Sequence, residues 1–202
     1  MSEVIKGPWP DPAVPRTTSR PTAKIPGSDW ATGLVQVQPT TKVASFRPLL
    51  AADQQQLWRW LHLALWDPPP AGPRPLAVLQ RPEARVYAED WGRPDDLGLV
   101  AVVDGTDVGA CWMRVLPQGI GVAFVDAVTP QLGIALEPAF RRQGYGKALT
   151  MKSLRAAWDR GHPQVSLTVH SLNPAIALYE ACGFRKIDER GLFHLMLAKS
   201  SG

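Results

Sequence analysis

Two apolar, β-branched runs flank the dipeptide Asp104-Gly105, and this pattern constrains the fold more than any other feature of the chain. The runs cover 97–103 and 108–116, and Asp-Gly between such runs is a strong signal for a β-hairpin. Further strands are expected at 131–136 and 165–170, alternating with a helix over 147–160 and another that opens at Asn173-Pro174. A hairpin followed by strand–helix–strand units predicts a mixed α/β sheet flanked by helices.

The remaining elements divide the chain at about residue 42. Seven of the 20 prolines fall within 1–42, a density that no helix or strand survives, so this part is expected to be an arm, flexible or docked through its tryptophans. Folded structure is expected over 43–202. It should begin with a strand at 44–49 and a helix over 53–66 that Asp67 and three prolines stop. The other expected elements are a helical stretch at 83–90 and closing strands at 184–188 and 192–198.

Composition excludes several classes of protein. Of the 202 residues, 45% are hydrophobic and 20% are charged, which is enough to build a core, and the net charge is +4. So mild a charge favours neither an anionic ligand nor nucleic acid. Cys111 and Cys182 match no disulfide framework or metal-site spacing, so a reduced, cytoplasmic chain without a metal is expected. No secretory signal and no membrane-spanning stretch is visible.

The segment 134–147 has the features of an anion-binding loop. A strand should end near Leu136, and Gly144 and Gly146 stand two residues apart just before a helix. The start of a helix presents amides without internal partners, and glycine lets a phosphate come close to them. Nearby cationic side chains strengthen the site. The spacing fits neither the Walker loop nor the dinucleotide fingerprint, so a pyrophosphate site of another kind is predicted.

Two segments together resemble the signatures of one family. Arg141-Arg142-Gln143-Gly144-Tyr145-Gly146 is similar to the Q/R-x-x-G-x-G/A motif of the GNAT superfamily, the Gcn5-related N-acetyltransferases. The second signature, an Asn followed by A-x-x-LYE-x-x-GF, resembles the segment 173–184. The likeness is strong over 130–185 and does not reach 1–42. It implies the GNAT fold, a central mixed sheet flanked by helices.

The resemblance also implies acetyl-CoA as the acyl donor. Relatives bind the pyrophosphate on the amides of the loop, and the pantetheine arm pairs with the preceding strand where that strand splays from the next. It thus implies the following contacts for the donor: Ile134, Ala135, Leu136, Arg141, Arg142, Gln143, Gly144, Tyr145, Gly146, Lys147 and Asn173.

Acetyl transfer requires an acid for the departing sulfur and a neutral amine. The resemblance assigns the acid to Tyr179, although a packed aromatic side chain is the alternative. A backbone amide near Leu136 is expected to polarise the thioester carbonyl. The strand that carries a glutamate in some relatives has Leu167 or Thr168 here, so the general base stays open. Candidates for it are Glu137, Asp126, His170, and Glu89 or Asp90. Cys182 is not expected to act as a nucleophile.

The sequence therefore predicts transfer of an acetyl group, by direct attack, to a primary amine of a small molecule or peptide. The acceptor site should lie in 51–95 and 117–130. A non-catalytic acyl-CoA-binding or sensor module is the main alternative; the absence of a clear base favours it, and the presence of Tyr179 opposes it. No nucleic-acid partner is expected, because the arm lacks clustered basic and aromatic residues, and no membrane partner is expected, because no apolar stretch is long enough to span a bilayer. Whether the protein forms a homodimer stays open.

Overall fold

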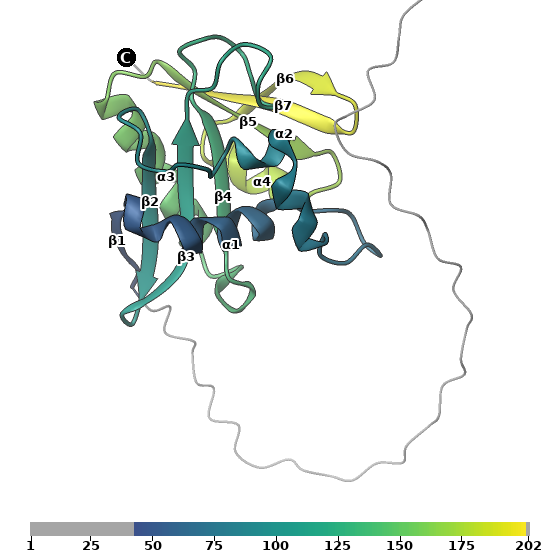
Figure 1. Cartoon of the computed structure of the whole chain (residues 1–202). Helices are drawn as coiled ribbons and strands as arrows, with labels where there is room; N and C mark the ends of the chain where they lie inside the picture. The colour runs from purple at the N-terminus through teal and green to yellow at the C-terminus, as the bar shows by residue number, and fades with distance from the viewer. Residues whose placement is uncertain (1–42, 201–202) are drawn as a thin grey trace, which may run out of the picture.

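The computed structural model describes residues 43–200 and contains one seven-stranded mixed sheet. The strands lie in the order β1-β2-β3-β4-β5-β7-β6, and β4 with β5 is the parallel pair (Figure 1). The predicted mixed sheet is confirmed. The strand bounds are β1 Ser45–Pro48, β2 Leu97–Val103, β3 Thr106–Arg114, β4 Gln131–Leu136, β5 Gln164–His170, β6 Arg185–Arg190 and β7 Phe193–Lys199.

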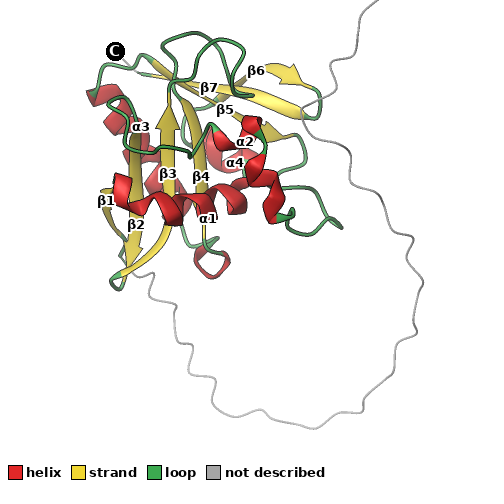
Figure 2. Ribbon diagram, in the orientation of Figure 1, coloured by secondary structure: helices red, strands yellow, loops and turns green. Residues whose placement is uncertain are grey.

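Four α-helices cover the two faces of the sheet. Figures 1 and 2 show α1 crossing one face over β2, β3 and β4, while α3 and α4 lie on the opposite face. The helices are α1 Gln54–Ala64, α2 Pro82–Arg85, α3 Tyr145–Asp159 and α4 Ile176–Ala181. Short 3₁₀ turns precede three of them, at Ala51–Asp53, Leu76–Gln80 and Pro138–Phe140.

Each face of the sheet has its own hydrophobic cluster. Trp60 and Leu57 of α1 are fully buried against Trp112 of β3. On the other face, Leu149 of α3 packs with Phe184 and other buried residues of the sheet. Apolar residues recur along α1 and α3 at the three- and four-residue spacing that buries one side of a helix. Trp60 therefore belongs to the core.

The boundaries of the elements differ from the sequence prediction mainly at helix ends. The hairpin is as predicted, with φ angles of 50° at Asp104 and 74° at Gly105. The first helix ends at Ala64 rather than Trp66. The helix expected to open at Asn173 begins at Ile176, because Asn173 and its neighbours form a capping turn instead. The helix expected over 83–90 is short, and the chain turns from residue 86 onward.

The predicted proline-rich arm at 1–42 lies outside the described residues, and the predicted domain at 43–202 extends slightly beyond them. The division of the chain at residue 42 therefore stays a prediction.

Within 43–200 no helix has the length and apolar character needed to cross a membrane. The same residues hold no group of histidine, cysteine or acidic side chains that could bind a metal ion.

A buried ion pair fixes the segment between α2 and β2. Arg114 at the end of β3 is 1% exposed, and its Nε and Nη2 donate to the two carboxylate oxygens of Asp96, both at 2.7 Å. Its Nη1 donates to the carbonyls of Val86 at 2.9 Å and Glu89 at 2.7 Å. Burial is the largest single influence and would raise the pKa of Asp96, but the hydrogen bonds and charge of Arg114, together with the amides of Gly92 and Arg93, outweigh it and hold that pKa below its ordinary value.

Replacing Asp96 with asparagine should destabilise the protein strongly. Arg114 would keep its charge in a buried site without a counter-charge, and breaking a buried pair in this way costs about 3 to 5 kcal/mol of unfolding free energy. Because the pKa of Asp96 is lowered in the folded state, its contribution is present above about pH 4 and is lost as the pH falls further. Urea unfolding at pH 7 and at pH 3 should therefore show that the difference in unfolding free energy between the parent and Asp96→Asn is smaller at pH 3. A difference that does not change with pH would contradict this.

Candidate active site

The sheet opens between β4 and β5. The two strands share one bridge, Gln131 opposite Ser166 near their starts, and the carbonyl of Pro130 accepts a hydrogen bond from the Ser166 amide at 3.0 Å. Along β3, by contrast, β4 is paired from Gln131 to Leu136. The second half of β4 therefore has a neighbour on one edge and a gap on the other.

The register of β4 on β3 decides which amides face this gap. The amide of Glu137 donates to Val108 at 2.8 Å, and partners alternate along an antiparallel pair. Ala135 therefore directs its amide toward β3, whereas Ile134 and Leu136 direct theirs toward β5. The carbonyl of Leu136 accepts a hydrogen bond from Nε of Arg141 at 2.9 Å. Of the three residues predicted to pair with the donor, Ile134 and Leu136 present backbone groups to the gap.

The loop after β4 leads into the start of α3, and five amides along this segment are unused. Arg142 and Gly144 have φ angles of 64° and 85°, which turn the backbone into the helix. The amides of Arg142, Gln143, Gly144, Gly146 and Lys147 donate to no acceptor within 43–200. Orphan amides at a helix start, together with the helix dipole, favour an anion. The side chains of Arg142 and Lys147 are exposed beside them.

The two glycines of the loop serve different purposes. A Cβ atom built on Gly144 would meet no atom within 4 Å, so the space in front of this residue is open. A Cβ on Gly146 would lie 3.0 Å from Cδ1 of Leu178, because α3 begins close to α4. Tyr145 between them is 4% exposed and belongs to the core. Gly144 fits the predicted contact with a phosphate, and Gly146 sets the packing of the helix start.

Asn173 and Tyr179 lie across the gap, before and within α4. Oδ1 of Asn173 accepts the amide of Ala175 at 2.9 Å, which closes the turn before α4. The Tyr179 ring packs edge-on against Phe184, with centroids 5.9 Å apart. Burial raises the pKa of the Tyr179 phenol, so the hydroxyl stays protonated at neutral pH. No hydrogen bond among the described residues uses this hydroxyl, which leaves its proton available to a ligand.

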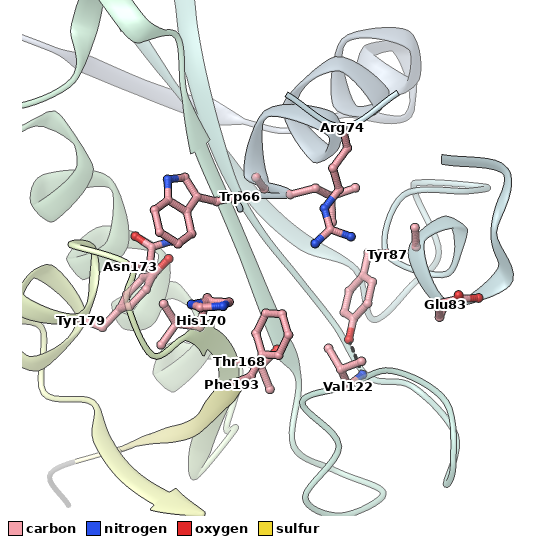
Figure 3. Close-up of a pocket in the computed structure, with 14 residues that line it drawn as sticks. Trp66, Arg74, Glu83, Tyr87, Val122, Thr168, His170, Asn173, Tyr179 and Phe193 are labelled. Carbon is pink, nitrogen blue, oxygen red and sulfur yellow. Dashed lines mark hydrogen bonds between the residues drawn. The ribbon is translucent and has the colours of Figure 1, made fainter. Parts of the chain in front are cut away.

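Both residues line an open pocket, shown in Figure 3. The end of α1, the proline-rich loop after it, α2, the end of β5 and α4 all contribute to its walls. Asn173 and Tyr179 stand on one side of the pocket, with Thr168 and His170 of β5 beside them (Figure 3). The pocket therefore joins the sheet gap to the region where the acceptor was predicted.

The structure separates the candidates for the general base. Glu137 is held by Arg59 in a two-point ion pair, with N–O distances of 2.8 and 2.9 Å. Asp126 accepts the amides of its own loop and a hydrogen bond from Gln164. Glu89 pairs with Arg85, and Asp90 lies 3.6 Å from Arg93. Of these candidates, His170 is the one that lines the pocket.

The two thiols have no catalytic setting. Cys111 is fully buried, and burial raises its pKa to about 12. Burial also raises the pKa of Cys182, which is 6% exposed. A buried, protonated thiol is a poor nucleophile, which agrees with the rejection of covalent catalysis by Cys182.

Several residues that line the pocket were not predicted from the sequence. Tyr87, just after α2, donates to Oε1 of Gln131 at 2.7 Å and accepts the amide of Val122 at 2.8 Å, and so fixes one wall. Trp66, just after the end of α1, lines the pocket, as do Arg74 and Phe193. No motif marks these positions, since they meet through contacts between segments far apart in the chain.

Comparison with known proteins agrees with this geometry. The sequence model of the acetyltransferase (GNAT) family matches residues 57–184, which is more than half of the chain. The chain belongs to the GNAT acetyltransferase family. The resemblance of the two motifs to the GNAT signatures is thereby confirmed, and the activity of this family is acetyl transfer.

Curated relatives and solved GNAT structures are similar to this chain. Mycothiol acetyltransferase of Nocardiopsis dassonvillei is 28% identical over 90% of this chain and 49% of its own length. That of Thermobifida fusca is 30% identical over 83% and 50%. The chain thus spans about half the length of these relatives. The PaiA N-acetyltransferase of Thermoplasma acidophilum, solved with coenzyme A, superposes with a TM-score of 0.57 at 18% identity, covering 78% of this chain and 99% of its own.

A second structure supports the GNAT fold in the same way. The ribosomal-protein-S18-alanine N-acetyltransferase of Escherichia coli has a TM-score of 0.56 at 21% identity, covering 78% of this chain and 94% of its own. At these identities the superpositions establish the fold alone. The GNAT fold predicted from the two motifs is confirmed.

Proposed function

We propose that the chain transfers an acetyl group from acetyl-CoA to a primary amine of a small molecule or peptide. One observation carries this proposal: unused backbone donors run from the open edge of β4 through the loop to the start of α3, and the Tyr179 phenol lines the pocket on the β5 side of the gap. Such a row suits a long ligand with a pyrophosphate at one end and a reactive thioester at the other.

The donor would bind along this row. Backbone groups of Ile134 would pair with the amide-containing arm of CoA, much as an added strand pairs with a sheet edge, which leaves the Leu136 amide for the thioester carbonyl. The amides of Arg142, Gln143, Gly144, Gly146 and Lys147 would receive the pyrophosphate, with the exposed Arg142 and Lys147 side chains adding charge. Arg141 supports the site indirectly, since its Nε is bound to the Leu136 carbonyl. Asn173 would contact the arm from the opposite side.

The chemistry follows from these positions. The neutral amine attacks the thioester carbonyl, and the Leu136 amide would stabilise the oxygen as it becomes negative. The C–N bond forms, the C–S bond breaks, and the Tyr179 phenol gives its proton to the departing sulfur. The extra proton of the attacking nitrogen passes to water, and the phenol regains its own proton from water. No carboxylate among residues 43–200 is required for this sequence.

The acceptor is proposed at the level of its class. The relatives are named mycothiol acetyltransferases, which makes the acceptor of those enzymes one member of the amine panel to be tested. A cytoplasmic location is also proposed, since Cys111 and Cys182 are both free thiols.

A second candidate function is an acyl-CoA-binding module without turnover. The ion pair of Glu137 with Arg59 favours it, because that pairing removes a carboxylate at the mouth of the gap from service as a base. This module would share the donor site and differ in lacking an acceptor.

Thiol release from acetyl-CoA in the presence of an amine panel separates the two functions. An acetyltransferase should release CoA thiol at least about tenfold faster with one or more amines than without, and mass spectrometry should detect the acetylated amine. Binding of CoA by calorimetry without turnover on any amine would favour the binding module. Failure to bind CoA at all would contradict both.

A further inference from the structure

His170 stands at the end of β5, where the gap meets the pocket. Its side chain is 6% exposed and lies on the same side of β5 as Thr168, facing the pocket. Two aromatic rings hold it edge-on: Trp66 at 5.6 Å and Phe193 at 5.4 Å between ring centroids. Figure 3 shows His170 and Trp66 on the side of the pocket that also carries Tyr179. The imidazole is therefore fixed in place at the reaction end of the pocket.

A backbone hydrogen bond decides where the imidazole carries its proton. The amide of Leu172 donates to Nδ1 of His170 at 3.1 Å, so Nδ1 must hold a lone pair. A neutral imidazole has one N–H, and it therefore lies on Nε2. Among the residues that the structure describes, no partner takes up this Nε2–H.

This arrangement is unsuited to a general base. To accept a proton, the neutral ring would have to use Nδ1 and give up the bond from Leu172. The nitrogen that is open to the pocket already carries hydrogen and has no lone pair to offer. A donor at this position instead binds an oxygen or another acceptor atom of the substrate.

The side chains around His170 have the same donor character. Figure 3 shows the guanidinium of Arg74, which is paired with Asp67, pointing into the space between Trp66 and Tyr87. Thr168 adds a hydroxyl to the lining. The carboxylate that lines the pocket belongs to Glu83, and it lies beyond Tyr87 on the far side from His170 (Figure 3). The titratable groups that share the pocket with His170 are Arg74, Glu83, Tyr87 and Tyr179.

We propose that His170 is a specificity residue that donates from Nε2 to an oxygen of the amine acceptor, so that the enzyme selects amines with an oxygen acceptor near the nitrogen. This proposal rests on the proposed acetyltransferase function and deepens it. The substrate oxygen would accept the hydrogen of Nε2. An amine with a methylene group in that place would leave the buried donor unpaired, which is costly.

Two variants divide the functions of the imidazole. In His170→Asn the side-chain oxygen can still accept the Leu172 amide, but the donor in the pocket is lost. In His170→Gln the longer side chain restores an N–H near the position of Nε2. A merely structural role predicts that both variants lose stability and activity together. A binding role predicts that His170→Asn loses selectivity and that His170→Gln regains part of it.

Matched amines serve as probes. The pairs are 2-methoxyethylamine with n-butylamine, and serinamide with 2-aminobutyramide, each differing by one oxygen acceptor. We expect the parent to favour the oxygen-bearing member in at least one pair by about tenfold in kcat/KM, the discrimination one hydrogen bond supplies. His170→Asn should abolish this preference by raising KM while kcat stays within about threefold. Comparing the ratio between proteins cancels the different basicities of the amines.

A spectrum of the resting protein tests the tautomer without any turnover. Long-range ¹H–¹⁵N correlation on the histidine ring should show protonated Nε2 and unprotonated Nδ1 at pH 8. The Nδ1–H form would overturn the proposal. An unchanged preference for the oxygen-bearing amine in His170→Asn would also overturn it. So would a loss of about 100-fold in kcat of this variant with KM and the preference intact, because that result is the signature of a general base. If the parent itself acetylated none of the amines, the proposed function would fail and this inference with it, whereas failure of the inference alone leaves the parent active.

Discussion

Gly144→Asp should raise the dissociation constant for CoA by at least about 100-fold. The carboxylate would project into the open space in front of the loop, where the pyrophosphate is proposed to bind, and would repel it. It would also cover amides whose hydrogen bonds to a charged group are each worth about 1.5 to 3 kcal/mol. Calorimetric titration of CoA into the parent and the variant measures the effect directly.

The fold should tolerate this change, and a second glycine offers a matched control. A Cβ at Gly144 contacts no atom within 4 Å, and aspartate is among the residues that best accept a positive φ. Gly161, at the other end of α3, has a φ of 84° and equally open surroundings. Gly161→Asp should therefore cost similar stability and leave CoA binding intact. Gly144→Asn keeps the shape without the charge and should bind CoA more tightly than Gly144→Asp. Parent-like binding by Gly144→Asp would refute the loop as the phosphate site.

Gly146 is less informative than its neighbour, although the sequence treats the two alike. A side chain there would press on Leu178 at 3.0 Å, so a loss of CoA binding would be mixed with a disturbed contact between α3 and α4. The motif shows that both positions need glycine, and the three-dimensional packing shows that they need it for different reasons.

Local signals in the sequence were sufficient to predict the order of the elements. Period-two and period-three-to-four patterns, the Asp104-Gly105 turn and Gly183 at the end of α4 all act over a few residues. The helix start at 173 was wrong by about one turn, because capping by Asn173 closes a turn before the helix begins. The gap between β4 and β5 depends on strands paired across the whole sheet, and no local pattern encodes it.

The residues proposed to bind the donor could be named from the sequence, and those of the acceptor side could not. Gly144, Asn173 and Tyr179 stand in two short motifs, and the fixed spacing within each motif marks them as candidates. Trp66 and Phe193 enclose His170 from segments more than 120 residues apart, and their sequences resemble ordinary core. The role of the imidazole itself depends on one bond from the Leu172 amide, which only the folded turn after β5 provides.

Tyr179→Phe should lower kcat by about 10² to 10⁴ while leaving CoA affinity nearly unchanged. That range is typical for the loss of a general acid. The substitution keeps the ring that packs edge-on against Phe184 and removes the hydroxyl alone. Since no hydrogen bond of the described residues uses that hydroxyl, the melting temperature should change little. Steady-state and single-turnover kinetics with an acceptor from the panel would measure the effect on the chemical step.

The pH profile distinguishes an acid from a packed aromatic ring. Burial raises the pKa of Tyr179, so the phenol stays protonated through the alkaline range in which the amine becomes neutral. The parent should therefore gain activity up to the pKa of the amine and show no loss from phenol ionisation near pH 10, the ordinary value for tyrosine. In Tyr179→Phe the departing CoA sulfur must take its proton from water. Because this sulfur is the same for every amine, kcat should fall by a similar factor for each acceptor. A kcat within about twofold of the parent would remove Tyr179 from the chemistry and leave it as part of the wall between α4 and the sheet.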